Sequence, residues 1–214
     1  MTTASPVPSD EISTGAFELA SRLLPPPILY HSIRVYLYAQ TLAEHRQDSW
    51  GKPDKQQLLF VACVLHDIGC APEYDGPQRF EVEGADAAAA LLRQFGPQVD
   101  ESDIHQVWTA IALHTSPGIA ERISDLARLV REGVLIDFGK DMALRSVFGD
   151  DDSRALVANF EKLYPRLDVE KELGDCVVNQ CKRRPEKAPA PSWPGILYRA
   201  AIENPSWEGV NKAF

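Results

Sequence analysis

Two histidines and two aspartates of this sequence stand at positions where a polar side chain is costly. His66 and Asp67 are adjacent and follow an almost wholly apolar stretch, and Asp137 lies inside a second apolar run. His31 shares the apolar face of an expected helix. A buried carboxylate is unfavourable unless it is ion-paired or bound to a metal. Because imidazole and carboxylate groups together suit divalent transition metals, the four residues predict a metal site.

Each residue alone has a simpler interpretation. His66 and Asp67 fit a hydrogen-bonded helix end that faces solvent. His31 fits a packed core histidine, and Asp137 fits a buried salt bridge. The occurrence of all four in one chain is what favours the metal site over the separate explanations.

Apolar residues at helical spacing predict the elements that must position these side chains. No stretch alternates like a strand, so we expect an all-α fold, a helical bundle around the metal site. Proline and glycine pairs mark the helix ends. The expected helices cover about 10–24, 28–47, 54–69, 81–95, 102–115, 119 or 124 to 138, 141–148, 153–164 and 168–181.

The domain organisation follows from the same pattern. Residues 1–27 read as an N-terminal arm with a short helix, and residues 28–181 as the domain itself. Residues 182–214 read as a linker and a tail, since 182–191 is rich in charge and proline. Trp193 and Trp207 in the tail indicate that it docks back onto the domain.

Bulk properties narrow the class of protein. The chain has 214 residues, a net charge of −9 and a pI near 5.0. An acidic surface repels phosphate backbones and anionic lipids, so we expect neither nucleic acid nor membrane as a partner. The first residues lack a secretory pattern, and the four cysteines form no CxxC pair, which favours reduced thiols and a cytoplasmic location. A homo-oligomer is compatible with the composition.

Five stretches in order carry a resemblance to a known family. They resemble the HD-domain metalloenzyme superfamily, and within it the fungal cyanamide hydratases, over roughly residues 28–175. The stretches are HisSerIleArgValTyr (31–36), LeuHisAspIleGly (65–69), ArgPheGluValGluGlyAlaAspAlaAla (79–88), LeuHisThrSerProGlyIleAla (113–120) and GlyValLeuIleAspPheGly (133–139). The resemblance implies one divalent metal, zinc with Fe²⁺ or Mn²⁺ as alternatives, whose ligands are His31, His66, Asp67 and Asp137.

The resemblance also implies a reaction. A hydratase of this kind adds water to a small neutral nitrile, converting cyanamide to urea through a metal-activated hydroxide. Asp67, His114 and Thr115 are the expected catalytic residues, with His114 or Asp67 relaying the proton. His114 has a simpler interpretation too, as a histidine that contacts the carbonyl groups at a helix end.

The candidate substrate-binding residues are Arg34, Arg79, Glu81 and Glu83. The two glutamates fit equally well as residues that stabilise the start of a helix. The main rival is an HD-type metal-dependent phosphohydrolase acting on a nucleotide-like substrate. It needs at least two cations near the metal, and Arg34 and Arg79 are the candidates.

Further features weigh against the rival readings. Many HD phosphohydrolases have a basic residue where this chain has Cys70. Between Asp67 and Asp137 there are only two histidines, His105 and His114, and His105 reads as a surface residue. This shortage favours one metal over a two-iron oxygenase centre. A non-catalytic, metal-stabilised interaction module is the remaining alternative.

Overall fold

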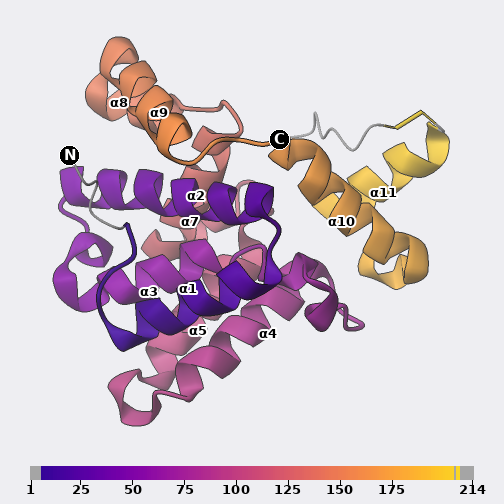
Figure 1. Ribbon diagram of the computed structural model, residues 1–214, viewed down its shortest axis with the longest axis horizontal. Coiled ribbons are helices and arrows are strands. Elements are labelled where there is room, and N and C mark those ends of the chain that lie inside the picture. Colours follow the sequence, from indigo (N-terminus) through magenta and orange to yellow (C-terminus); the bar gives the residue numbers. More distant parts are fainter. Residues whose placement is uncertain (1–5, 205, 208–214) are drawn as a thin grey trace.

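The computed structural model describes residues 6–204, 206 and 207, and within them the chain forms eleven α-helices and no strand (Figure 1). The predicted all-α fold is confirmed. The helices are α1 (Glu11–Leu23), α2 (Pro26–His45), α3 (Pro53–Val64), α4 (Phe80–Arg93), α5 (Glu101–Leu113), α6 (Ala120–Ile123), α7 (Asp125–Asp137), α8 (Met142–Phe148), α9 (Asp150–Leu163), α10 (Val169–Arg183) and α11 (Trp193–Glu203).

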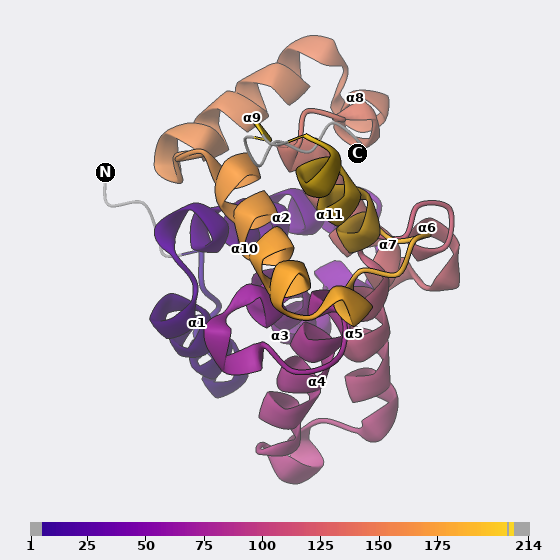
Figure 2. The ribbon, with the colours of Figure 1, turned by 90° about the vertical axis from the view of Figure 1, so that its right-hand side faces the viewer.

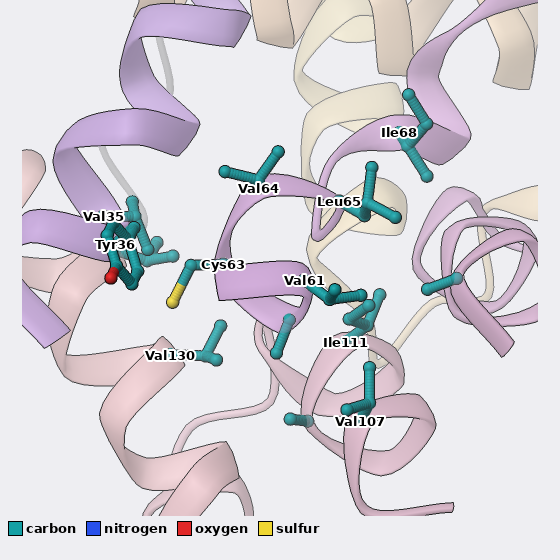
Figure 3. Close-up of a cluster of buried hydrophobic side chains, with 14 of the residues drawn as sticks. Val35, Tyr36, Val61, Cys63, Val64, Leu65, Ile68, Val107, Ile111 and Val130 are labelled. Carbon is teal, nitrogen blue, oxygen red and sulfur yellow. The ribbon is translucent and has the colours of Figure 1, made fainter. Parts of the chain in front are cut away.

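Helix α3 lies at the centre of the molecule. It packs against α1, α2, α5 and α7, which explains why its second half, residues 58–64, is apolar on every side. Figure 3 shows Val61, Cys63 and Val64 of this helix among side chains of α2, α5 and α7. All three are fully buried. The core is therefore built around the helix that leads directly to the predicted metal ligands.

Side chains at the helix starts fix where the helices begin. Asp10, Asp100, Ser124 and Ser192 each accept a hydrogen bond from a backbone N–H three residues later. These bonds satisfy donors that the first helical turn leaves without a partner. Helices α2 and α3 instead begin with proline, whose missing N–H costs nothing at that position.

Two glycines allow backbones to approach closely around the predicted site. A Cβ atom on Gly69 would lie 1.9 Å from the carbonyl oxygen of Phe80, at the start of α4. A Cβ atom on Gly133 of α7 would lie 2.7 Å from the carbonyl oxygen of Val35 in α2. Only glycine permits these approaches. They hold the turn after α3 against α4, and α7 against α2.

The structure differs from the expected elements after α3. The helix ends at Val64 and not near residue 69, and a separate 3₁₀ turn, Ile68–Cys70, follows. His66 and Asp67 therefore lie in a sharp turn. Tertiary packing overrides the apolar pattern here because the backbone at Gly69 must meet α4.

The segment 182–191 also differs from a free linker. Lys187 in this segment is 1% exposed, and its ammonium group donates to Asp75 Oδ1 at 2.9 Å and to the Gly76 carbonyl at 2.9 Å. The segment is thereby fixed to the loop before α4. Helices α10 and α11 then lie side by side over one flank of the molecule, the flank that faces the viewer in Figure 2.

Of the helices in residues 6–204, none combines the length and the apolar character that crossing a bilayer requires.

Candidate metal centre

Four elements bring the polar residues of the site together. His31 lies in the second turn of α2, and His66 and Asp67 lie in the turn that follows α3. His114 caps the end of α5, and Asp137 is the last residue of α7. All five are at most 2% exposed. A buried polar cluster of this size needs its charges balanced from within.

The three histidines are held by the same ring atom. Each Nδ1 lies 2.7 Å from an oxygen that accepts a hydrogen bond, which is Asp137 Oδ2 for His31, the Cys63 carbonyl for His66 and the Ile111 carbonyl for His114. Carbonyl and carboxylate oxygens accept, so Nδ1 carries the proton. In the neutral imidazole the Nε2 atom then has the lone pair that a metal binds.

The three Nε2 atoms converge on the carboxylate of Asp67. Its Oδ2 lies 3.1 Å from His66 Nε2 and 3.6 Å from His31 Nε2, while its Oδ1 lies 3.4 Å from His114 Nε2. His31 and His66 place their Nε2 atoms 3.2 Å apart. Nitrogen lone pairs and carboxylate oxygens that face one another this closely repel unless a proton or a metal ion lies between them.

The donor set fits a divalent metal ion. The oxygens of Asp67 are buried and receive no hydrogen bond from any described residue. The ligand atoms of His31, His66 and Asp67 all lie within 4.8 Å of one another. Ligands at about 2.1 Å from a tetrahedral metal are separated by roughly 3.4 Å, which is close to the distances found. The chain therefore has a site that can hold a divalent ion, as predicted.

Electrostatics keep the carboxylate ionised and one histidine neutral. Burial pushes the pKa of Asp67 upward, but His66 and His114 outweigh it and hold the pKa well below its usual range. Burial lowers the pKa of His31 in spite of its bond to Asp137. For His66, the neighbouring Asp67 outweighs burial and raises the pKa. An anionic Asp67 and a neutral His31 are the forms that bind a metal.

Asp137 occupies a different position from the one expected. It lies at the Nδ1 side of His31, outside the group formed by His31, His66 and Asp67. Arg34 donates to both of its oxygens, from Nε to Oδ1 at 2.6 Å and from Nη2 to Oδ2 at 2.7 Å. The structure thus uses Asp137 to orient His31, while its direct ligation of the ion stays a prediction.

The expected substrate contact of Arg34 is replaced by a structural one. Its side chain is fully buried, and its remaining Nη1 group donates to the backbone carbonyl groups of Tyr164 at 2.7 Å and Pro165 at 3.2 Å. Protein acceptors therefore surround the guanidinium group. Arg34 joins α2 to Asp137 and to the loop between α9 and α10.

The other candidates divide into two groups. Glu81 is fully buried and accepts hydrogen bonds from Arg79 Nη2 and, at 2.6 Å, from the hydroxyl of Thr115. Glu83 instead accepts a backbone N–H bond from Gln78 at 2.7 Å, near the start of α4. Glu81, Arg79 and Thr115 thus form a connected group next to His114, whereas Glu83 stabilises the helix start.

Sequence reasoning missed the apolar wall of the site. An inner void is lined by His31, His66, Asp67, His114, Thr115, Val134, Phe138, Leu173 and Trp193. Trp193 begins α11 and lies 56 residues after Asp137 in the sequence, at 7% exposure against Phe80. The sequence did indicate that a tryptophan in the tail packs onto the domain, but no spacing rule shows that this tryptophan lies next to the histidines.

Comparisons with known proteins agree with this geometry. Residues 28–132 match the family model described as HD domain. A stretch of 63 residues is 35% identical to two proteins of the yeast Saccharomyces cerevisiae, cyanamide hydratase DDI2 and cyanamide hydratase DDI3. That stretch is 29% of this chain and only 27% of each yeast protein, so the chain matches about a quarter of the length of these relatives.

Proposed function

Because the chain carries an HD domain, the domain of a family of metal-dependent enzymes, we propose that it is a metal-dependent hydratase of a small nitrile, with cyanamide as substrate and urea as product. His31, His66 and Asp67 would hold the ion, which we propose to be zinc. The local likeness to two proteins named cyanamide hydratase supports the reaction.

The observation that carries the proposal is the lining of the inner void. Among the described residues that line it there is no lysine and no arginine. The remaining walls, Val134, Phe138, Leu173 and Trp193, are apolar or aromatic. A phosphate group would lose its hydration there without gaining a cationic partner from the walls. A small neutral substrate avoids that cost.

The chain's own residues account for binding and proton movement. A bound divalent ion would acidify a water molecule and polarise the nitrile. His114 Nε2, held 3.4 Å from Asp67 Oδ1 by the bond of Nδ1 to Ile111, is placed to take a proton and return it to the nitrile nitrogen. Water adds across the carbon–nitrogen triple bond, so no leaving group has to be bound.

Glu81 and Thr115 position this proton relay. Thr115 follows His114 in the chain, and its hydroxyl is fixed by Glu81 at 2.6 Å. The backbone carbonyl of His114 accepts a hydrogen bond from Arg131 at 3.1 Å. The end of α5 is thereby held on both sides, so the imidazole keeps its orientation toward Asp67.

A phosphohydrolase is the second candidate, because Arg79 and Arg131 line an outer cavity beside the inner void. Both guanidinium groups already have acidic partners, with Arg79 bonded to Glu81 and Arg131 lying 3.4 Å from Glu121. A phosphate would have to compete with these carboxylates. The geometry therefore favours the hydratase.

The experiment combines metal analysis of the purified protein with two assays. We expect about one zinc ion per chain and urea formation from cyanamide that stops when the ion is chelated and returns when it is added back. Phosphate release from a panel of nucleotides, without urea formation, would overturn the hydratase in favour of the phosphohydrolase. A His114→Gln variant that retains the ion but forms urea at least tenfold more slowly would support the relay.

A further inference from the structure

Two cavities meet at the same pair of side chains. An outer cavity of about 330 Å³ lies between the start of α4, the turn after α5 and the start of α11. The inner void with the metal-binding residues lies beside it and is smaller. Thr115 and Trp193 line both spaces. A route from the outer cavity to His31, His66 and Asp67 therefore runs past these two side chains.

Thr115 is the fixed side of this passage. It is 6% exposed, and its hydroxyl donates to the fully buried Glu81 at 2.6 Å. Glu81 is in turn held by Arg79. Moving Thr115 would break the hydrogen bonds of a buried carboxylate, which is costly.

Trp193 is the bulky side of the passage. Its ring packs against Phe80 with 5.7 Å between centroids. It begins α11, whose position is set by Ser192, since the Ser192 side chain accepts from the Gly195 N–H and donates to the Pro189 carbonyl. A tryptophan ring fills more space than any other side chain. Its removal would join the inner void to the outer cavity.

The outer cavity is suited to a larger substituent. Ile119 and Ile196 lie at its rim and are 53% and 41% exposed, and Pro117 and Pro191 complete the apolar lining. Its volume falls in the range of cavities that bind organic ligands. In the wild-type protein Trp193 lines both this space and the inner void, so its ring narrows the route between them.

We propose that Trp193 determines substrate size, admitting the smallest nitriles to the metal group and excluding those with bulky substituents. The inference rests on the proposed function, since it names which members of the nitrile class react. Truncation of Trp193 lets the substituent of a larger substrate occupy the outer cavity, so that its cyano group can reach the metal-binding residues.

The test compares Trp193→Ala with Trp108→Ala as a matched control. Trp108 lies on α5, outside both cavities just described, and its indole donates to Asp86 at 2.7 Å. For each protein, kcat/KM is measured with cyanamide and with N-benzylcyanamide. We expect the preference for cyanamide to fall at least tenfold in Trp193→Ala and to stay unchanged in Trp108→Ala. An unchanged preference in a metal-loaded Trp193→Ala protein overturns the inference.

A second measurement tests the size selection by Trp193 independently of the hydratase reaction. The proteins are loaded with Co²⁺, and the visible spectrum is recorded with azide and with 4-phenylimidazole. We expect azide to alter the spectrum of all three proteins and 4-phenylimidazole to alter only that of Trp193→Ala. This pattern without urea formation by any protein would refute the hydratase and retain the size selection. A wild-type spectrum that responds to 4-phenylimidazole refutes the size selection.

Discussion

His66 and His114 present the same ring nitrogen to Asp67 because a carbonyl three residues earlier holds each ring. The Cys63 carbonyl binds Nδ1 of His66 and the Ile111 carbonyl binds Nδ1 of His114, both at 2.7 Å. Both contacts exist because α3 and α5 end just before the histidine. At the residue scale the site is thus a consequence of where two helices stop.

His66→Ala and Asp67→Ala should each abolish metal binding. Either change removes one of the three proposed ligands, whose donor atoms lie within 4.8 Å of one another. Metal content after dialysis is the measurement, with His105→Ala as the control, because His105 is an exposed histidine that stacks on Trp108. Full metal content in both ligand variants would refute the assignment.

Asp137→Asn should weaken metal binding without abolishing it. The asparagine oxygen can still accept from His31 Nδ1, but the charge that orients the ring and balances Arg34 is lost. Loss of such a supporting partner lowers metal affinity about 10- to 100-fold. Competition with a chelator measures the change. A much larger loss would show that Asp137 binds the ion directly.

At the scale of elements, the sequence predicted most of the helices to within a few residues, but it ended α3 too late and did not predict α11. The apolar run through Leu65 continues past Val64, where α3 ends, so periodicity alone extends the helix too far. Proximity of Asp137 to Arg34 was not predicted either, although Arg34 follows His31 by one helical turn. Burial patterns identify which side chains face inward, but partners distant in sequence depend on how the helices pack.

Gly69→Ala should strongly destabilise the fold. The new Cβ would lie 1.9 Å from the Phe80 carbonyl oxygen and 2.8 Å from the Gly84 nitrogen, so backbone would have to move. Overpacking of this kind costs about 3 kcal/mol. Denaturant unfolding of the metal-free protein measures it.

Gly15→Ala is the control for that prediction. Gly15 lies inside α1. The nearest atom to a Cβ there would belong to Phe95 at 3.5 Å, an ordinary van der Waals distance. Because alanine favours helix more than glycine does, we expect equal or greater stability, by up to about 1 kcal/mol. Equal losses in both variants would contradict the role of the close approach at Gly69.

At the scale of the molecule, ionic contacts fix the C-terminal segment to the body. Asp75 accepts from Lys187 at 2.9 Å and from Arg183 at 2.7 Å, and its backbone carbonyl accepts from Arg184. Lys187 is nearly fully buried, and a buried ammonium group without a carboxylate partner would destabilise the fold, so its pairing with Asp75 stabilises the attachment. The same segment leads to Trp193, so these contacts also help to set the wall of the site.

Asp75→Asn should lower the free energy of unfolding by about 3 kcal/mol at neutral pH, because it leaves the buried Lys187 ammonium without its carboxylate. Burial acts to raise the pKa of Asp75, but the bonds from Lys187 and Arg183 hold it below its ordinary value of 3.8. The stability that ionised Asp75 gives to the folded protein is therefore present above pH 3.8 and is lost as the pH falls below it.

Unfolding at several pH values tests this. The difference between wild type and Asp75→Asn should shrink below about pH 3.8. Asp175→Asn, which removes the partner of the exposed Lys171, should change the free energy of unfolding far less than Asp75→Asn does, at any pH. A difference for Asp75→Asn that does not change with pH would contradict the ionic role.

The position of Trp193 in the chain has a consequence for the order of events during synthesis. His31, His66, Asp67 and Asp137 all precede residue 138, whereas Trp193 follows 56 residues after Asp137. A chain that emerges from the ribosome therefore contains all of the proposed ion-binding residues before Trp193 has been synthesised. We expect nascent protein to take up its ion more readily than the finished protein exchanges it.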